Sequence, residues 1–167
     1  MRYFMIVVIT FFCFSASSQA ATLSMGDGLR LLAIDGQVIV EKNTLPVEIK
    51  LGKRQVVISY EKMLSGNNRG NSGSYRNRKN TIVTSSPYIF FVDINQDTNI
   101  SVKRYTSAFQ ARSAIQRGLV FNVENQQETK QIDNADMLKG NGVNPFSPTN
   151  LEPLIDTYNQ ENGINYE

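Results

Sequence analysis

The chain has 167 residues, with 17 basic and 15 acidic side chains and a formal net charge of +2. It contains no histidine, and its single cysteine is Cys13. This composition excludes an imidazole base and a Cys/His zinc site, and so small a net charge predicts no general attraction to nucleic acid or to an anionic membrane.

The first residues are typical of a secretory signal peptide. Arg2 supplies the positive start, residues 4–14 are almost continuously apolar, and residues 15–21 are small or polar. The apolar run is too short for a permanent membrane-spanning helix, and Ser18 and Ala20 fit the positions before a cleavage site. We expect residues 1–20 to be removed after Ala20 as the protein is exported to the periplasm or beyond; an uncleaved anchor is the alternative. The exported chain would then lack cysteine, which excludes a thiol nucleophile and disulfides.

Alternating apolar residues predict a β-hairpin at the start of the exported chain. Asp35-Gly36 lies between two such runs and predicts a type I′ turn, because both central residues of that turn need a positive φ. Asp35 is therefore interpreted as a turn residue rather than a catalytic carboxylate. The residues expected to share one face of the hairpin are Leu29, Leu31 and Ala33, followed by Val38 and Val40.

Further strands are predicted wherever apolar and β-branched residues alternate, at residues 47–51, 55–60, 81–84, 88–94, 99–105 and 119–123. Residues 95–98 are expected to reverse the chain so that residues 99–105 pair back on the strand before them. The helical spacing of Ala108, Ala111 and Ile115 predicts a helix over 107–117, and Gly118 is expected to end it. Helices are also expected over 126–138 and from Asn150 to Tyr158, with a linker at 139–147.

These elements predict a mainly β protein: an antiparallel β-sandwich or meander with one to three short helices towards the C-terminus. We divide the chain into a signal peptide at 1–20, a β domain at 21–124 and a polar, partly helical C-terminal extension at 125–167. The run from Tyr88 to Val92 is apolar on both faces and is interpreted as a central strand. At a sheet edge, the same run would be a site for strand addition by another chain.

A basic loop at residues 65–80 is the predicted contact surface. It follows Lys62 and holds Arg69, Tyr75, Arg76, Arg78 and Lys79, with no acid between Glu61 and Asp93. Arginines beside an aromatic ring can bind carboxylate, sulfate or phosphate groups and stack on a sugar or planar ring. The alternative is a solvated hairpin loop whose charges keep the neighbouring strands soluble.

No metal, cofactor or catalytic centre is predicted. Asp93, Asn95, Asp97 and Asn99 alternate as at the start of an EF-hand loop, but Thr98 and Arg104 stand where that loop needs glycine and glutamate. A calcium site is therefore disfavoured against an ordinary turn. No pair of carboxylates lies in a context that predicts a raised pKa, so we expect a protein that is not an enzyme.

The motifs LRLLAIDGQ, LPVEIKLGKRQVVISYEK and IVTSSPYIFFVDI, which follow the signal peptide, resemble the YccT-like family of secreted proteins from Gram-negative bacteria. The resemblance runs from Leu23 to about Val123 and rests on structural motifs. It implies an envelope protein without enzyme activity, and a role in restraining the polymerisation of curli-type amyloid fibre subunits.

The sequence thus favours a periplasmic, non-enzymatic binding protein that contacts another envelope or secreted protein through a sheet edge or the basic loop. The alternatives are a module that binds a cell-envelope glycan through Tyr75 and its neighbouring arginines, and a structural envelope protein. No nucleic acid partner is expected.

Overall fold

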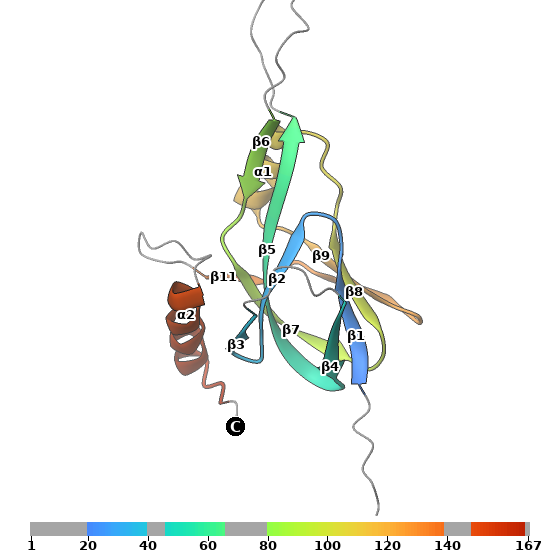
Figure 1. Ribbon diagram of the computed structural model, residues 1–167, viewed down its shortest axis with the longest axis vertical. Coiled ribbons are helices and arrows are strands. Elements are labelled where there is room, and N and C mark those ends of the chain that lie inside the picture. Colours follow the sequence, from blue (N-terminus) through green and yellow to red (C-terminus); the bar gives the residue numbers. More distant parts are fainter. Residues whose placement is uncertain (1–19, 40–45, 66–79, 139–147, 166–167) are drawn as a thin grey trace, which may run out of the picture.

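The computed structural model describes residues 20–39, 46–65, 80–138 and 148–165, which form two β-sheets and two helices (Figure 1). The strands are β1 (Ala20–Met25), β2 (Leu29–Ile34), β3 (Gln37–Val38), β4 (Val47–Lys50), β5 (Gly52–Ser65), β6 (Asn80–Thr84), β7 (Tyr88–Ile94), β8 (Thr98–Val102), β9 (Phe121–Asn125), β10 (Thr129–Ile132) and β11 (Asp136–Met137). The helices are α1 (Ala108–Arg117) and α2 (Pro148–Glu161). No helix in these ranges is long and apolar enough to cross a membrane.

Two sheets face one another. Sheet A has the strand order β10-β9-β8-β1-β4, and sheet B has the order β11-β7-β5-β2-β3, with β6 paired to the C-terminal half of β5. Neighbouring strands are antiparallel except β1 and β8, which run parallel. The main core between the sheets joins side chains such as Phe121 of sheet A to Tyr88 and Phe90 of sheet B. The predicted mainly β fold with sandwich-like sheets is confirmed.

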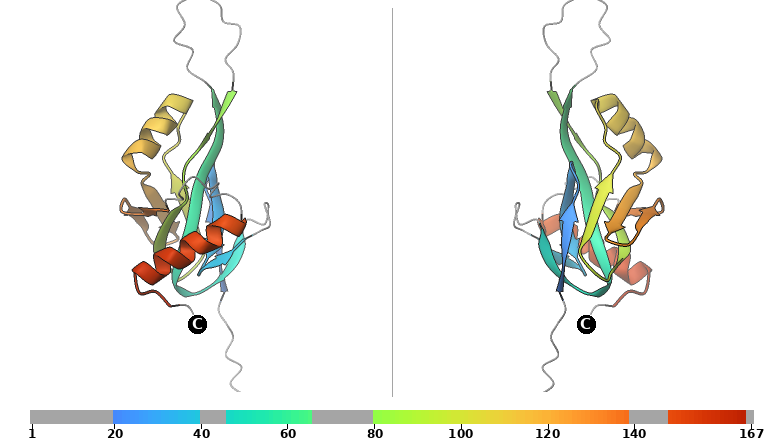
Figure 2. Two further views of the ribbon diagram at one scale, coloured as in Figure 1. Left: turned by 90° about the vertical axis from the view of Figure 1, so that its left-hand side faces the viewer. Right: turned by 90° about the vertical axis from the view of Figure 1, so that its right-hand side faces the viewer.

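Helix α2 covers the outer face of sheet B (Figure 2). Leu151 and Ile155 of the helix pack with Val57 and Ile89 in a second, smaller core. Because a strand directs successive side chains to opposite faces, β5 and β7 supply one set of residues to each core. This explains why apolar residues occupy consecutive positions at 56–58 of β5 and at 88–92 of β7. The prediction of a central strand holds only at Tyr88 and Ile89, which pair with β5 on one side and β11 on the other; residues 90–94 have no strand partner on the β11 side among the described residues.

Helix α1 agrees closely with the helix predicted over 107–117. The Ser107 hydroxyl accepts a hydrogen bond from the Gln110 backbone N–H and caps the first turn, as N-terminal serines commonly do. Gly118 has a φ of 90° and ends the helix. Ala108, Ala111 and Ala114 are buried, and they let the helix pack closely beside the β5–β6 ribbon.

A β-bulge changes the predicted face of Ala33. Leu31 pairs with Ile58, but Ala33 pairs with Val57, so one extra residue interrupts the alternation in β2. Leu31 therefore faces the main core while Ala33 faces α2. The expectation that Leu31 and Ala33 share a face is wrong, because apolar residues occupy both faces here and the sequence pattern does not reveal the bulge.

The expected pairing of residues 99–105 with the preceding strand is also wrong. The chain does reverse at residues 95–97, but it crosses from β7 in sheet B to β8 in sheet A. There, β8 pairs with β1 and β9 instead of β7. A crossing between sheets and a hairpin use the same turn residues, so the turn signal does not distinguish them.

The segment 126–138 is not helical. It forms β10, which adds to the edge of sheet A, and β11, which adds two residues to sheet B. Ile132 and Leu138 are buried, one in each core, and these long-range contacts determine the local conformation. The final helix is confirmed, although it begins at Pro148 and encloses Asn150.

Candidate functional site

A groove of about 940 Å³ opens where the edge strands β3 and β4 of the two sheets approach the C-terminal end of α2. Ile34, Val38 and Ile49 contribute apolar surface to it, whereas Glu48 and Lys50 contribute charge. This volume lies within the range of ligand-binding pockets in proteins. The groove is therefore the candidate site within the described part of the chain.

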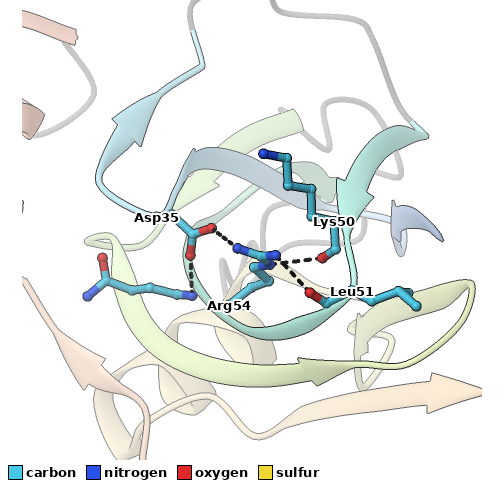
Figure 3. Close-up of polar contacts among 5 residues, drawn as sticks. Asp35, Lys50, Leu51 and Arg54 are labelled. Carbon is cyan, nitrogen blue, oxygen red and sulfur yellow. Dashed lines mark hydrogen bonds and ion pairs between the residues drawn. The ribbon is translucent and has the colours of Figure 1, made fainter. Parts of the chain in front are cut away.

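The Asp35-Gly36 turn forms one end of the groove. Asp35 has a φ of 47° and Gly36 a φ of 79°, as a type I′ turn requires, so the predicted turn is confirmed. The Asp35 carboxylate accepts hydrogen bonds from the Gln55 backbone N–H at 2.9 Å and from Arg54 Nη1 at 3.1 Å (Figure 3). The aspartate thus fastens the β2–β3 turn to the start of β5.

Arg54 extends this connection to β4. Its Nε donates to the Lys50 carbonyl at 2.8 Å, and its Nη2 donates to the Leu51 carbonyl at 2.7 Å (Figure 3). With the ion pair to Asp35, three of its N–H groups are in use. Arg54 therefore holds the end of β4 beside the hairpin turn and shapes the groove.

The backbone of β4 presents unpaired hydrogen-bonding groups to the groove. Thr22 of β1 and Gly26, which directly follows the strand, direct their N–H groups towards the β8 side, to Asp97 and the Ile100 carbonyl. The backbone N–H and C=O groups of successive residues point to alternate sides of a strand, so those of Ala21 and Leu23 point towards β4. Their register partners on β4 are Ile49 and Val47. The N–H and C=O groups of Glu48 and Lys50 must then point away from β1.

This open edge is short. Pro46 precedes the strand and has no N–H, and the Lys50 carbonyl already accepts from Arg54. The free groups are therefore the Glu48 N–H, the Glu48 carbonyl and the Lys50 N–H, which have no partner among the described residues. Such an edge can accept an extended segment of another chain by strand addition.

A buried amide contact holds α2 at the wall of the groove. Gln55 Nε2 donates to Asn159 Oδ1 at 2.7 Å, and the Gln55 side chain is 0% exposed. The other amide atom, Gln55 Oε1, is buried without a partner in the described structure. At the helix surface, the Tyr158 hydroxyl donates to Asp136 Oδ2 at 2.9 Å. Burial, followed by this hydrogen bond and the charge of Asp136, raises the pKa of Tyr158 to about 12.

The predicted contact residues of the basic loop lie outside the described residues, so the structure does not place Arg69, Tyr75, Arg76, Arg78 or Lys79. Lys62, at the start of this basic stretch, is described and forms an ion pair with Asp27 in the β1–β2 turn. Its charge is therefore compensated by an acid far away in the sequence.

The alternating Asp/Asn residues that begin like a calcium loop connect β8 to β1 instead. Asp97 Oδ1 accepts from the Thr22 N–H at 2.7 Å, and this hydrogen bond lowers the pKa of Asp97. Asn99 Oδ1 accepts from the Ser24 hydroxyl at 3.1 Å. Nowhere in the described ranges do three His, Cys, Asp or Glu residues gather in a way that could hold a metal ion.

Sequence reasoning missed the groove because its walls come from distant segments. The pairing of β4 with β1, and the position of α2 over sheet B, are long-range contacts that no local pattern shows. One signal was available: Pro46 before the short alternating run VEIK is typical of an edge strand.

Comparison with known proteins identifies the family to which the chain belongs. No curated protein and no solved structure matches the chain significantly. A family model described as "Uncharacterized protein conserved in bacteria (DUF2057)" matches residues 22–166, which begin within β1 and include all later strands of the described ranges and both helices. The chain therefore belongs to this bacterial DUF2057 family.

Proposed function

We propose that this chain is an exported, non-enzymatic protein of the bacterial envelope that binds an extended segment of another envelope or secreted protein. The binding site is the groove beside β4, and the mode of binding is the addition of a strand to sheet A. The observation that carries this proposal is the open β4 edge, with the Glu48 and Lys50 backbone groups facing the groove.

The groove supplies the two components that strand addition needs. Main-chain hydrogen bonds to Glu48 and Lys50 give affinity for any extended backbone, and pockets for alternate side chains give selectivity. The apolar side chains of Val38 and Ile49 suit an apolar residue that points between the sheets. A subunit that polymerises by strand pairing offers such segments before it assembles, so the expected restraint of fibre assembly is the finer form of this proposal.

The test separates backbone pairing from side-chain contact. Glu48→Pro removes the outward N–H but breaks no bond to β1, so the edge strand should tolerate it. Glu48→Ala is the matched control, since it removes the side chain and keeps the N–H. A photo-crosslinking residue at Gln37, which is exposed on β3 across the groove, reports occupancy in living cells.

We expect the Gln37 probe to capture one dominant envelope or secreted protein in the parent chain and in the Glu48→Ala variant, with capture lost in Glu48→Pro. A probe at Lys130, on the opposite edge of sheet A, should not capture it. Equal thermal unfolding of the variants establishes that they are folded. Undiminished capture by Glu48→Pro, or equal loss in both variants, would contradict strand addition; capture of glycan alone would favour a glycan-binding module.

A further inference from the structure

The charge pattern of β4 is complementary to itself. The strand reads Val47-Glu48-Ile49-Lys50, and the Glu48 and Lys50 side chains are both exposed. When two copies of such a strand pair antiparallel about Ile49, each Glu48 lies directly opposite the Lys50 of the other copy. Opposite charges that face each other across a strand pair stabilise it.

We propose that a second copy of this chain pairs with the first along β4, forming a two-fold dimer in which sheet A continues from one copy into the other. The two-fold axis passes beside Ile49. Each half of the interface contains the same groups, as in every two-fold interface between identical chains.

The backbone directions agree with this register. In an antiparallel ladder, directly opposite residues whose N–H and C=O groups point at each other exchange two hydrogen bonds. Glu48 and Lys50 are the residues of β4 whose groups point away from β1, and the register pairs them with each other. The Lys50 carbonyl already accepts from Arg54 Nε at 2.8 Å. The bond from the Lys50 N–H to the Glu48 carbonyl of the other copy, made twice, therefore carries the pairing.

Other edges within the described ranges lack this pattern. Strands β3 and β11 are two residues long, and beyond β11 the outer edge of β7 at residues 90–94 carries Asp93 as its sole charge. Lys130 is the sole charged residue of β10, and β6 has none, so antiparallel self-pairing of either strand brings no opposite charges together. Charge complementarity thus selects β4.

The dimer would occupy the same edge as a bound partner segment, so the two states exclude each other. Self-association then protects an open strand edge until a partner displaces the second copy. The dimer requires only the self-complementary β4 and no particular partner protein.

Charge-reversal variants test the β4 dimer, and sedimentation equilibrium on the protein purified after export measures how tightly each variant dimerises. Glu48→Lys places two lysines opposite each other in the paired strands, and Lys50→Glu places two glutamates opposite each other. Each variant should therefore dimerise at least about tenfold more weakly than the parent. An equimolar mixture of the two variants should form a heterodimer, and the chain carrying both substitutions should dimerise again. Lys130→Glu is the control and should leave the dimer unchanged.

A parent chain that stays monomeric at every concentration would overturn the proposal. It would also be overturned if the single variants dimerised as tightly as the parent, or if neither the mixture nor the double substitution restored the dimer. Recovery in the mixture excludes misfolding as the cause of the loss. A monomer that still captures another protein from the Gln37 probe would refute the dimer and leave the proposed function intact.

Discussion

The buried pair of Gln55 and Asn159 predicts an asymmetric response to substitution. Gln55 is fully buried on β5 and makes one side-chain hydrogen bond, to Asn159 on α2. Asn159 lines the groove, so water can reach it from that side. Removing Asn159 leaves the whole Gln55 amide unpaired in the second core. Removing Gln55 eliminates a partnerless buried oxygen and leaves an asparagine that water can satisfy.

The magnitudes follow from the cost of an unpaired buried polar group, about 1–3 kcal/mol. Asn159→Leu should lower the free energy of unfolding by about 2 kcal/mol, and Gln55→Leu by less than about 1 kcal/mol. The double variant replaces both partners by apolar groups and should resemble Gln55→Leu. The double variant should then lose about 2 kcal/mol less than the sum of the two single effects, as expected for residues in direct contact.

Urea unfolding followed by circular dichroism measures these differences. With a slope of about 2 kcal/mol per molar urea, a loss of about 2 kcal/mol moves the midpoint by about 1 M. An Asn159→Leu variant as stable as the parent would refute the reasoning, and so would a double variant that loses the sum of the single effects. Either result would mean that the amide contact does not hold α2 on sheet B.

Three further predictions concern a turn, a pH dependence and a close contact. Asp35→Ala should lower the free energy of unfolding by about 2–3 kcal/mol, because it removes two hydrogen bonds and places alanine at positive φ. Asp35→Asn should lower it by only about 1 kcal/mol, and equal losses of the two variants in urea unfolding would contradict this. The pKa of Tyr158 in the folded protein is about 12, above its ordinary value of 10.0. The protonated hydroxyl therefore makes its whole contribution to the free energy of unfolding below pH 10, and this contribution is lost as the pH rises towards 12. Tyr158→Phe should therefore show a shallower alkaline decline in urea midpoints, and an unchanged decline would exclude the contact with Asp136 as its cause. In Gly28→Ala, the new Cβ would lie 2.9 Å from Tyr60 Cε2, and alanine would have to adopt a φ of +83°. Thermal unfolding should therefore show a free energy of unfolding about 2 kcal/mol lower, and unchanged stability would contradict this close approach.

The sequence predicted those elements whose signals are local. The Asp35-Gly36 turn, the helix beginning after Ser107 and the strand at 88–94 match the structure closely. Each has a specific short-range cause: glycine at positive φ, a capping hydroxyl, or a run of β-branched and aromatic residues.

The same reasoning failed where local polarity and tertiary contacts disagree. Residues 126–138 are polar enough to suggest a surface helix, yet Ile132 and Leu138 are buried in different cores, and the strands β10 and β11 form in this segment. At Ala33, the bulge moves the side chain to the α2 face without any sequence signal.

The sequence by itself determined the fold class and the turn role of Asp35, because alternating apolar residues and an Asp-Gly turn act within a few positions of the chain. It also predicted an exported protein. Tertiary structure alone decided that β4 pairs with β1 at the edge of sheet A and that α2 covers sheet B through Gln55 and Asn159. The groove arises where these distant segments meet, and its open edge depends on which backbone groups β1 has already paired. Such long-range pairings reflect the packing of the whole chain and leave no mark in the order of neighbouring residues.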